Sequence, residues 1–395
     1  MDKMKKIASS NLFWVLLVTV LAMFAHSKSQ KQILAGGGDG WDGISYHALY
    51  DHFVGKQAAA PAEYPFCKRT GLPYLASRLN LDAAKSFLVI NLVCGFMAIG
   101  FCYLVLVGRY SSLTVWACLM PMLFYLFSPV RFPHYYPFTV DPPAVLFYAV
   151  TAYFLSRAFF FPAILALVLS CLFKETGALL AILLPLALFA MKRVNAKALV
   201  LMILLALSGL LLMKLIQQGD CSGSQFRQAS HNIALKLTHP MGVLKWVAGI
   251  SLTLAPFLIP ALQNRLPAFK DLETAAALSA VFLALAVVMG LAGGSDTSRI
   301  FFIIYPLYVL FLGALIDRAP TGAVVVAMAG GLIANRAFNR IPEPQNYHPD
   351  NDVSGFFSYF PDHGHIDGAL SLILFWIVIQ WLARHSGKLR SSGTH

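Results

Sequence analysis

The chain has 395 residues, of which 58% are hydrophobic and 12% are charged, and its mean hydropathy is +0.67. Soluble domains carry about twice that share of charged residues, so the composition excludes an ordinary water-soluble globular protein. The formal net charge is +12, and the distribution of the basic residues along the apolar chain bears on its orientation in a bilayer.

Apolar runs bounded by charged residues, proline or glycine follow one another along the chain and have lengths near that of a bilayer-crossing helix. The runs are 11–26, 86–108, 112–128, 141–157, 159–173, 176–191, 198–216, 245–262, 274–292, 300–316, 320–336 and 367–383. The runs 159–173 and 176–191 are short for a span and could be tilted, re-entrant or merged. We expect an all-α polytopic protein with about 12 transmembrane helices, in a range of about 10 to 13, that forms a single membrane domain over residues 1–395.

If the chain crosses the membrane 12 times, both termini lie on the same side. Basic residues also gather at the ends of the runs that lie on that side. The positive-inside rule assigns that side to the cytoplasm. The first run follows a basic start and could be a signal peptide, but no A-x-A cleavage site follows it, which favours an uncleaved span. The basic residues are Lys3, Lys5, Lys6, Lys192, Arg193, Lys197, Arg384, Lys388 and Arg390.

The longer polar segments then fall on the outer face. Either they are polar because they lie in water, or they contribute to one active site on that face. Two are long, the first outer loop 27–85 and the last outer loop 337–366. The others are 131–141, 173–176, 217–244 and 293–299.

The first outer loop contains the stretch GGGDGWDGISYHALYD at 36–51. Its glycines stop a helix that would continue from the first span, and the residues after Gly43 predict a short helix that carries Tyr46 and Tyr50 on one face. Asp42 stands at the start of that helix. It is either an N-cap whose side chain accepts a backbone N–H or a general base at the membrane interface.

The same loop continues as YPFCKRTGLPYLASRLN, with Lys68, Arg69 and Arg78. Because LPYLASRL is apolar at helical spacing, we expect this segment to lie in the plane of the membrane interface with its cations directed at headgroups. These cations could anchor the loop to anionic lipid or hold the phosphate of a lipid-linked substrate.

Further ionisable and aromatic residues lie near span ends on the outer face. Lys174 and Glu175 fall between two short apolar runs, where they could form a mutual salt bridge or serve a function. Asp296 and Arg299 begin a span and could be a cap and a headgroup anchor. Beside Arg131, the rings of Tyr135 and Tyr136 suit either an interfacial aromatic belt or a sugar.

Cysteine and histidine patterns indicate no metal centre. No CxxC or HExxH spacing occurs, and the histidines and acids of 337–366 could bind a divalent cation without any spacing that specifies one, so we assign no metal ligand and no cofactor. Cys67 and Cys221 fall in outer loops, where a disulfide could form in an oxidising compartment. The remaining cysteines lie in apolar runs and are interpreted as packing residues: Cys94, Cys102, Cys118 and Cys171.

Several of these motifs resemble the GT-C superfamily of polytopic glycosyltransferases, which use polyprenyl-phosphate sugars. The resemblance rests on Asp42-Gly43-Ile44-Ser45-Tyr46-His47 and on the basic segment Lys68-Arg69-Thr70-Gly71-Leu72-Pro73 that leads into an apolar helix. Three further segments are similar to bacterial members: 139–157, 169–188 and 293–307.

The resemblance implies that Asp42 matches the first-loop acid that acts as base toward the acceptor hydroxyl in an inverting transfer. The chain departs from the family pattern at Gly43, where many relatives carry a second acid, and at His47, where a second tyrosine is common. Which of Asp39, Asp42 and Asp51 is the base therefore stays open.

We accordingly expect a bacterial plasma (inner) membrane enzyme with cytoplasmic termini and a site on the outer face. It would transfer a sugar from a lipid-linked donor to a hydroxyl of a glycan, glycolipid or protein, surrounded by membrane lipids and without a nucleic-acid partner. The alternatives are a transporter or lipid-linked glycan flippase, and a non-catalytic export or assembly subunit. Candidate catalytic residues are Asp42 and Asp39; candidate donor phosphate-binding residues are Arg69, Lys68, Lys174, Arg299 and Arg131; candidate acceptor- or sugar-binding residues are Tyr46, His47, Tyr135, Tyr136, Glu175, Asp141 and Asp296.

Overall fold

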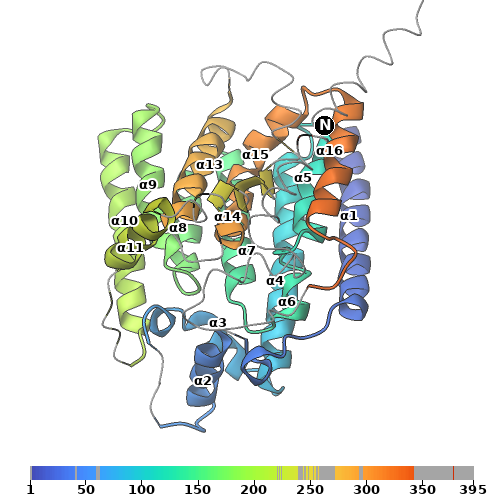
Figure 1. Cartoon of the computed structure of the whole chain (residues 1–395). Helices are drawn as coiled ribbons and strands as arrows, with labels where there is room; N and C mark the ends of the chain where they lie inside the picture. The colour runs from blue at the N-terminus through green and yellow to red at the C-terminus, as the bar shows by residue number, and fades with distance from the viewer. Residues whose placement is uncertain are drawn as a thin grey trace, which may run out of the picture. The chain divides into compact units, whose positions relative to one another are not determined.

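The computed structural model is helical throughout the part of the chain that it describes (Figure 1). That part comprises residues 2–40, 42–58, 63–219, 272–292 and 297–341, together with much of 221–257 and residue 377. The predicted class of helical membrane protein is confirmed at this level. The predicted span 367–383, most of 245–262, most of the loop 337–366 and the site candidate Asp296 lie outside the described residues.

Contacts divide the chain into two compact units that alternate along the sequence. Unit 1 comprises Met1–Lys31, Leu106–Arg131 and Phe226–His395, and unit 2 comprises Gln32–Val105 and Phe132–Gln225. The first-loop acids, Arg69, Asp141, Lys174 and Glu175 all belong to unit 2. The candidate site can therefore be described within one unit.

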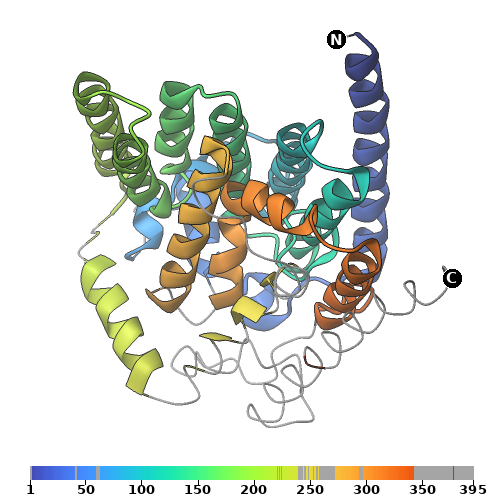
Figure 2. The ribbon, with the colours of Figure 1, turned by 90° about the horizontal axis from the view of Figure 1, so that it is seen from above.

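Unit 2 packs four consecutive apolar helices against one another and carries the first loop as short helices. Close contacts join α7 with α8, α8 with α9, and α10 with both α8 and α9 (Figures 1 and 2). Asn195 begins α10 as a side-chain cap, since its Oδ1 accepts the Ala198 N–H at 2.9 Å. The elements are η1 (Ala35–Gly38), α2 (Gly43–Phe53), η2 (Phe66–Lys68), α3 (Gly71–Ser77), α4 (Ala83–Leu106), α6 (Phe132–Tyr135), α7 (Asp141–Ser156), α8 (Phe160–Ser170), α9 (Thr176–Ala190) and α10 (Ala196–Ile216).

Unit 1 is built around α5, which contacts α1, α15 and α16. The Ser111 hydroxyl caps α5 by accepting the Thr114 N–H, and Asp317 Oδ1 accepts both the Ser111 N–H (2.9 Å) and the Thr114 hydroxyl (2.8 Å). The elements are α1 (Asp2–Ser29), α5 (Ser112–Phe124), α11 (Gln225–Thr238), α13 (Thr274–Ala292), α14 (Thr297–Ile303), α15 (Tyr305–Ile316) and α16 (Thr321–Ala334).

Four of the described helices are long and apolar enough to cross a membrane: Asn11–Ser29 of α1, α4, α10 and α13. Helix α8 has 11 residues and is therefore about 16 Å long, half the thickness of a bilayer core. The predicted single run 300–316 is divided between α14 and α15, because Pro306 in the first turn of α15 cannot donate the backbone hydrogen bond that would join them.

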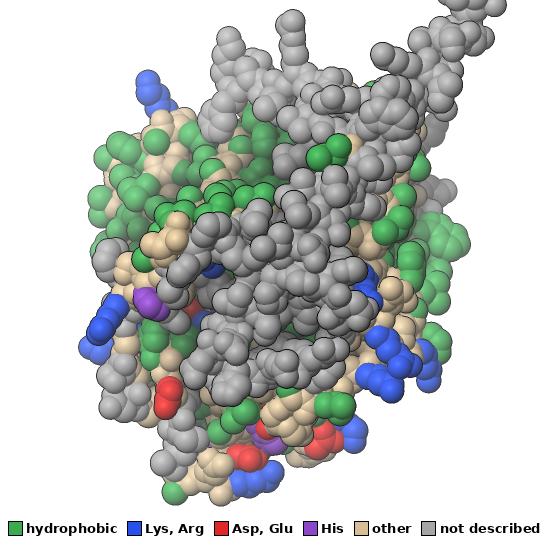
Figure 3. All heavy atoms as spheres, in the orientation of Figure 1, with side chains coloured by type: hydrophobic (Ala, Val, Ile, Leu, Met, Phe, Trp, Pro, Cys, Tyr) green, Lys and Arg blue, Asp and Glu red, His purple; other side chains and the backbone are tan. Residues whose placement is uncertain are grey.

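The surface of unit 2 changes character from its long helices to its first loop. Apolar side chains cover the region of α9 and α10, whereas acidic, basic and histidine side chains gather near α2 (Figure 3). Such an apolar helix surface is typical of contact with lipid, and the polar end is typical of contact with water. On α10 the exposed apolar side chains are Val200, Leu201, Leu204, Leu207, Leu210, Leu211 and Leu215.

Candidate functional site

The glycine-rich stretch is folded into backbone conformations that few other residues adopt. Gly36 and Gly40 have φ angles of 61° and 70°. A Cβ on Gly40 would lie 2.4 Å from Tyr136 Cε2, and one on Gly43 would lie 2.9 Å from Phe138 Cβ. Glycine is therefore required for this loop to turn tightly against the 136–138 segment and begin α2.

Asp42 is the N-cap of α2, but its side chain makes no capping hydrogen bond. Its backbone has helical angles (φ −65°, ψ −21°), and its carbonyl oxygen accepts the N–H groups of Ser45 (3.1 Å) and Tyr46 (3.2 Å). An ordinary N-cap residue has extended backbone and a side chain that accepts from the first turn. The structure therefore disfavours the capping interpretation of this carboxylate.

The Asp39 carboxylate is paired with the His47 imidazole. The imidazole Nδ1 lies 2.9 and 3.0 Å from the two carboxylate oxygens, and Nε2 lies 4.0 Å from Asp51 Oδ2. The ring also stacks on Phe138 at a centroid separation of 5.1 Å. Asp39 thus fixes the orientation of His47, and the two neighbouring acids of the glycine-rich stretch have different surroundings.

Arg69 joins the first loop to the turn between α8 and α9. Its Nε donates to Glu175 Oε2 at 2.7 Å, its Nη2 donates to Glu175 Oε1 at 2.5 Å, and its Nη1 donates to the Tyr46 hydroxyl at 3.0 Å. Tyr46 is fully buried, and Arg69 is 8% exposed. The two-pronged contact with a carboxylate is the strongest pairing that a guanidinium makes.

Electrostatics couple this pair to Asp42. Burial by itself would raise the pKa of the Glu175 carboxyl, but the charge and hydrogen bonds of Arg69, with help from Lys174, outweigh burial and lower the pKa to about 2. Burial raises the pKa of the Tyr46 phenol. Asp42 contributes to the field at both Arg69 and Tyr46, so its carboxylate lies within electrostatic reach of the buried pair.

A second buried ion pair joins Lys174 to Asp141. The ammonium nitrogen lies 2.6 Å from Asp141 Oδ1, and the two side chains are 10% and 9% exposed. Lys174 and Glu175 are therefore paired with residues far away in the sequence rather than with each other. Because removing two charges from water is costly, the buried ionisable groups of these two pairs are candidates for a functional site.

Three polar residues that frame this cluster were assigned no function from the sequence. Asn91 Nδ2 donates to Pro137 O and Thr139 O, at 2.8 Å each, and so holds the segment that leads into Asp141. Tyr148 and Thr176 share a hydroxyl–hydroxyl hydrogen bond of 2.6 Å beside Glu175. A lone amide within the apolar run 86–108 was the sequence signal that could have identified Asn91.

Arg131 and Arg299 belong to unit 1, whereas the residues of the charged cluster belong to unit 2. Arg131 is fully buried and donates to backbone carbonyl oxygens at the ends of α5 and α16. This is the arrangement of a structural cation at helix C-termini. Arg299 is 7% exposed within α14. The acceptors of Arg131 are Phe124 O (2.8 Å), Asn335 O (3.1 Å), Arg336 O (2.8 Å) and Asn339 O (2.9 Å).

The two aromatic candidates of the 131–141 segment lie in the core of unit 2. Tyr135 is 3% exposed, and its carbonyl oxygen accepts the Ile33 N–H at 2.8 Å. Tyr136 is fully buried against Gly40. Neither ring offers a face to a sugar in this conformation, and neither forms part of an exposed aromatic belt.

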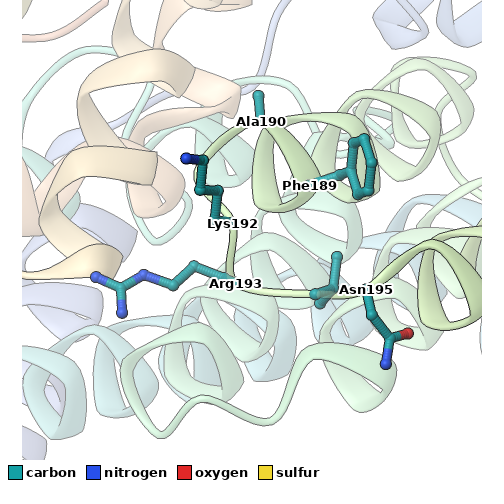
Figure 4. Close-up of a pocket in the computed structure, with 6 residues that line it drawn as sticks. Phe189, Ala190, Lys192, Arg193 and Asn195 are labelled. Atoms are coloured by element: carbon teal, nitrogen blue, oxygen red, sulfur yellow. The ribbon is translucent and has the colours of Figure 1, made fainter.

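A surface hollow of about 530 Å³ lies at the turn between α9 and α10, lined by Phe189, Ala190 and residues 192–195 (Figure 4). The side chains of Lys192 and Arg193 extend to one side of the turn, away from Phe189 (Figure 4). Glu175 precedes the first turn of α9, whereas the hollow lies beyond its last turn. The hollow is therefore separate from the charged cluster.

Comparison of the chain with protein-family models, with curated proteins and with solved structures gives no match. Within the described part of the chain, no three His, Cys, Asp or Glu side chains are grouped so that they could hold a metal ion. The function of the chain is therefore inferred from the chemistry of the charged cluster around Arg69 and Glu175.

Proposed function

We propose that this chain is a multi-pass membrane glycosyltransferase of the GT-C type. It transfers a sugar from a polyprenyl-phosphate donor to a hydroxyl of a glycan, glycolipid or protein on the outer face of a bacterial plasma membrane. The proposal rests on the position of Asp42. Its carboxylate stands at the start of α2, makes no capping hydrogen bond to the helix and interacts electrostatically with the buried Arg69.

The reaction needs a base and a stabilised leaving group. Asp42 accepts the proton of the acceptor hydroxyl as its oxygen bonds to the anomeric carbon of the sugar. The bond from that carbon to the phosphate oxygen breaks on the opposite side, so the configuration inverts and the lipid phosphate leaves with the electron pair. Cations near the developing phosphate charge lower the barrier.

Arg69 and Lys68 are the cations that suit the leaving phosphate best. Glu175 and Tyr46 hold three of the guanidinium N–H groups, and Nη1 and Nη2 each keep one more N–H for a phosphate oxygen. Lys68, which precedes Arg69 and is the last residue of η2, has its ammonium nitrogen 5.1 Å from the centroid of the Tyr64 ring and is only half-buried. Lys174 is compensated by Asp141, so we assign this pair to the support of the site.

The remaining candidates fall into two groups. His47 stands beside the acids of the first loop and suits recognition of the acceptor, with Asp39 as the residue that orients it, whereas the fully buried Tyr46 supports Arg69 through its hydroxyl. The surroundings of the other group favour structural roles, and we leave its members out of the proposed site: Arg131, Tyr135 and Tyr136.

The proposed topology places about 12 spans around this site, with both termini cytoplasmic and the first loop outside. The disulfide between Cys67 and Cys221 supports that orientation, because disulfides persist in oxidising compartments and are rare in the cytoplasm. The ion pair between Arg69 and Glu175 supports a position of the turn between α8 and α9 on the outer side in this topology, together with the first loop.

Sugar transfer by purified protein in nanodiscs, measured with a panel of polyprenyl-phosphate sugars, tests the proposal. We expect Asp42→Asn to reduce turnover by about 10²- to 10⁴-fold, the usual contribution of a general base. Asp82→Asn is the matched control, since Asp82 lies in the same loop, is exposed and pairs with Lys85. The control should retain its activity.

Absence of turnover with every donor, together with normal cellular glycans in the Asp42→Asn strain, would overturn the assignment. Substrate movement by the protein in proteoliposomes would then identify the transporter alternative. Equal activity of Asp42→Asn and the wild type would retain the enzyme class but remove Asp42 as the base.

A further inference from the structure

Two cysteines that are distant in the sequence are joined beside Arg69. Cys67 and Cys221 form a disulfide across a separation of 154 residues, with their Cα atoms 5.9 Å apart. Cys67 is fully buried in η2, two residues before Arg69. The other four cysteines form no disulfide and lie in or next to apolar helices.

The disulfide belongs to a set of contacts that fastens the 67–71 segment to its surroundings. The Gln218 N–H donates to Cys67 O at 3.0 Å, and the Thr70 hydroxyl donates to the Ile216 carbonyl oxygen at 3.4 Å. These contacts hold the segment to the C-terminal end of α10. Water can replace either of these hydrogen bonds, but it cannot replace the covalent bond between the two cysteines.

On its other side the segment touches the turn after α8. The Gly71 N–H donates to Leu172 O at 2.9 Å, and a Cβ at position 71 would lie 2.7 Å from the same oxygen. Glycine therefore permits a close backbone approach. Between these attachments at Cys67 and Gly71, Arg69 has little freedom, and it meets Glu175 with the Nε and Nη2 edge of its guanidinium.

We propose that the Cys67–Cys221 disulfide is the positioning element that sets Arg69 against Glu175 and Tyr46, so that oxidation of the chain stabilises the assembled candidate site. Without the cross-link, the segment is held by hydrogen bonds alone and opens locally more often. The effect on sugar transfer rests on the proposed function. The effect on the accessibility of Arg69 does not.

Formation of the bond requires a disulfide-bearing oxidant on the outer face. A thiolate of one cysteine attacks the oxidant's disulfide, and the thiolate of the second then displaces the oxidant from the mixed disulfide. The two cysteines lose two protons and two electrons, and the oxidant is reduced to its dithiol. A disulfide-bearing oxidant of the outer compartment is therefore the partner for maturation of this site.

Thiol counting and limited proteolysis test the proposal without any substrate. Denatured wild-type protein should label four of its six cysteines with a maleimide before reduction and all six afterwards. In nanodiscs, Cys67→Ser/Cys221→Ser should be cleaved by trypsin after Lys68 and Arg69 about tenfold faster than the oxidised wild type. Digests are analysed after reduction, and cleavage after the exposed Lys56 is the internal reference.

Donor kinetics supply the second measurement. If transfer occurs, the double variant should show kcat/KM for the donor lowered about tenfold, with kcat lowered as well as KM raised, because Arg69 would contact the donor phosphate and stabilise its charge as it leaves. Cys102→Ser controls for the loss of a thiol, since Cys102 is a free, fully buried cysteine of α4. Its protease sensitivity and KM should equal those of the wild type.

Six reactive thiols in the purified wild type, or equal cleavage after Arg69 with and without the cross-link, would overturn the proposal. Faster cleavage of the double variant in a protein that turns over no donor would support the positioning element while rejecting the glycosyltransferase. The two proposals therefore fail in different measurements.

Discussion

Two of the buried arginines in the described part of the chain, Arg131 and Arg69, differ in the groups to which they donate hydrogen bonds. Arg131 of unit 1 is fully buried and donates to four backbone carbonyl oxygens at helix ends. Arg69 of unit 2 is 8% exposed and meets a carboxylate and a phenol. Helix ends supply a cation with fixed partial charges that cannot titrate or leave. A carboxylate on another turn can be protonated or displaced, so the Arg69 region has the chemistry of a site and the Arg131 region has that of a structural support.

Removing Arg131 should produce the largest loss of stability. Arg131→Met leaves four carbonyl groups without their donor, and each charged hydrogen bond contributes about 1.5–3 kcal/mol, so the loss should exceed about 4 kcal/mol. We expect little folded protein in size-exclusion and thermal unfolding measurements. Arg157→Ala at an exposed position is the control. A folded Arg131→Met variant with normal thermal stability would break the comparison.

Removing the partner of Arg69 should cost somewhat less, and the loss should be reversible by a second substitution. Glu175→Gln leaves a buried guanidinium without its counter-charge, a loss of about 3–5 kcal/mol. In the double variant Glu175→Gln/Arg69→Met both charges are absent, so thermal stability should recover most of that loss although transfer activity should not. Additive losses in the double-mutant cycle would indicate that the two residues are not coupled.

Lowering the pH should weaken the Arg69 region but leave the carbonyl contacts of the Arg131 region intact, because the carboxylate that pairs with Arg69 can be protonated. The pKa of Glu175 in the folded protein is about 2, below its ordinary value of 4.5. Stability from the pair with Arg69 is therefore complete above about pH 4.5 and is lost as the pH falls from 4.5 toward 2. Thermal unfolding of wild type and Glu175→Gln across this range should converge at low pH. Curves that stay parallel would contradict the lowered pKa.

The smallest effect is expected at Tyr46. Tyr46→Phe removes the hydroxyl that accepts the Arg69 Nη1–H while keeping the fully buried ring, so the loss of stability should be about 1 kcal/mol. Tyr50→Phe, which removes the hydroxyl that donates to Leu81 O, is the matched control. A larger change in transfer rate at Tyr46 than at Tyr50 would sharpen the assignment of Tyr46 to the site.

Much of the helical pattern follows from the sequence because it is local. The apolar runs and their charged or proline boundaries locate α4, α7, α9, α10, α13 and α16 closely, and the short helices α2 and α3 lie where the first-loop pattern predicts them. Pro306 also marks the break between α14 and α15 in the sequence itself. Local signals such as this proline thus locate the ends of helices even where the predicted apolar run is too long.

The partners of the buried charges could not be read from the sequence. Lys174 pairs with a residue 33 positions away and Arg69 with one 106 positions away, and such contacts depend on how helices pack rather than on any spacing. The acceptors of Arg131 are backbone carbonyls, which no side-chain pattern records. The same limit applies to Asp42, since only coordinates distinguish a carboxylate that caps a helix from one that does not.

Asn91 has a consequence for how the chain is made. Its side chain lies at a buried position of α4, a helix that can cross the membrane, and its amide donates to carbonyls 46 and 48 residues further on. An amide without a partner is costly in hydrocarbon, so α4 enters the bilayer bearing a group that later synthesis must satisfy. We therefore expect α4 to remain beside the insertion machinery until residues 137–139 emerge, and the two segments to be released into lipid as one unit.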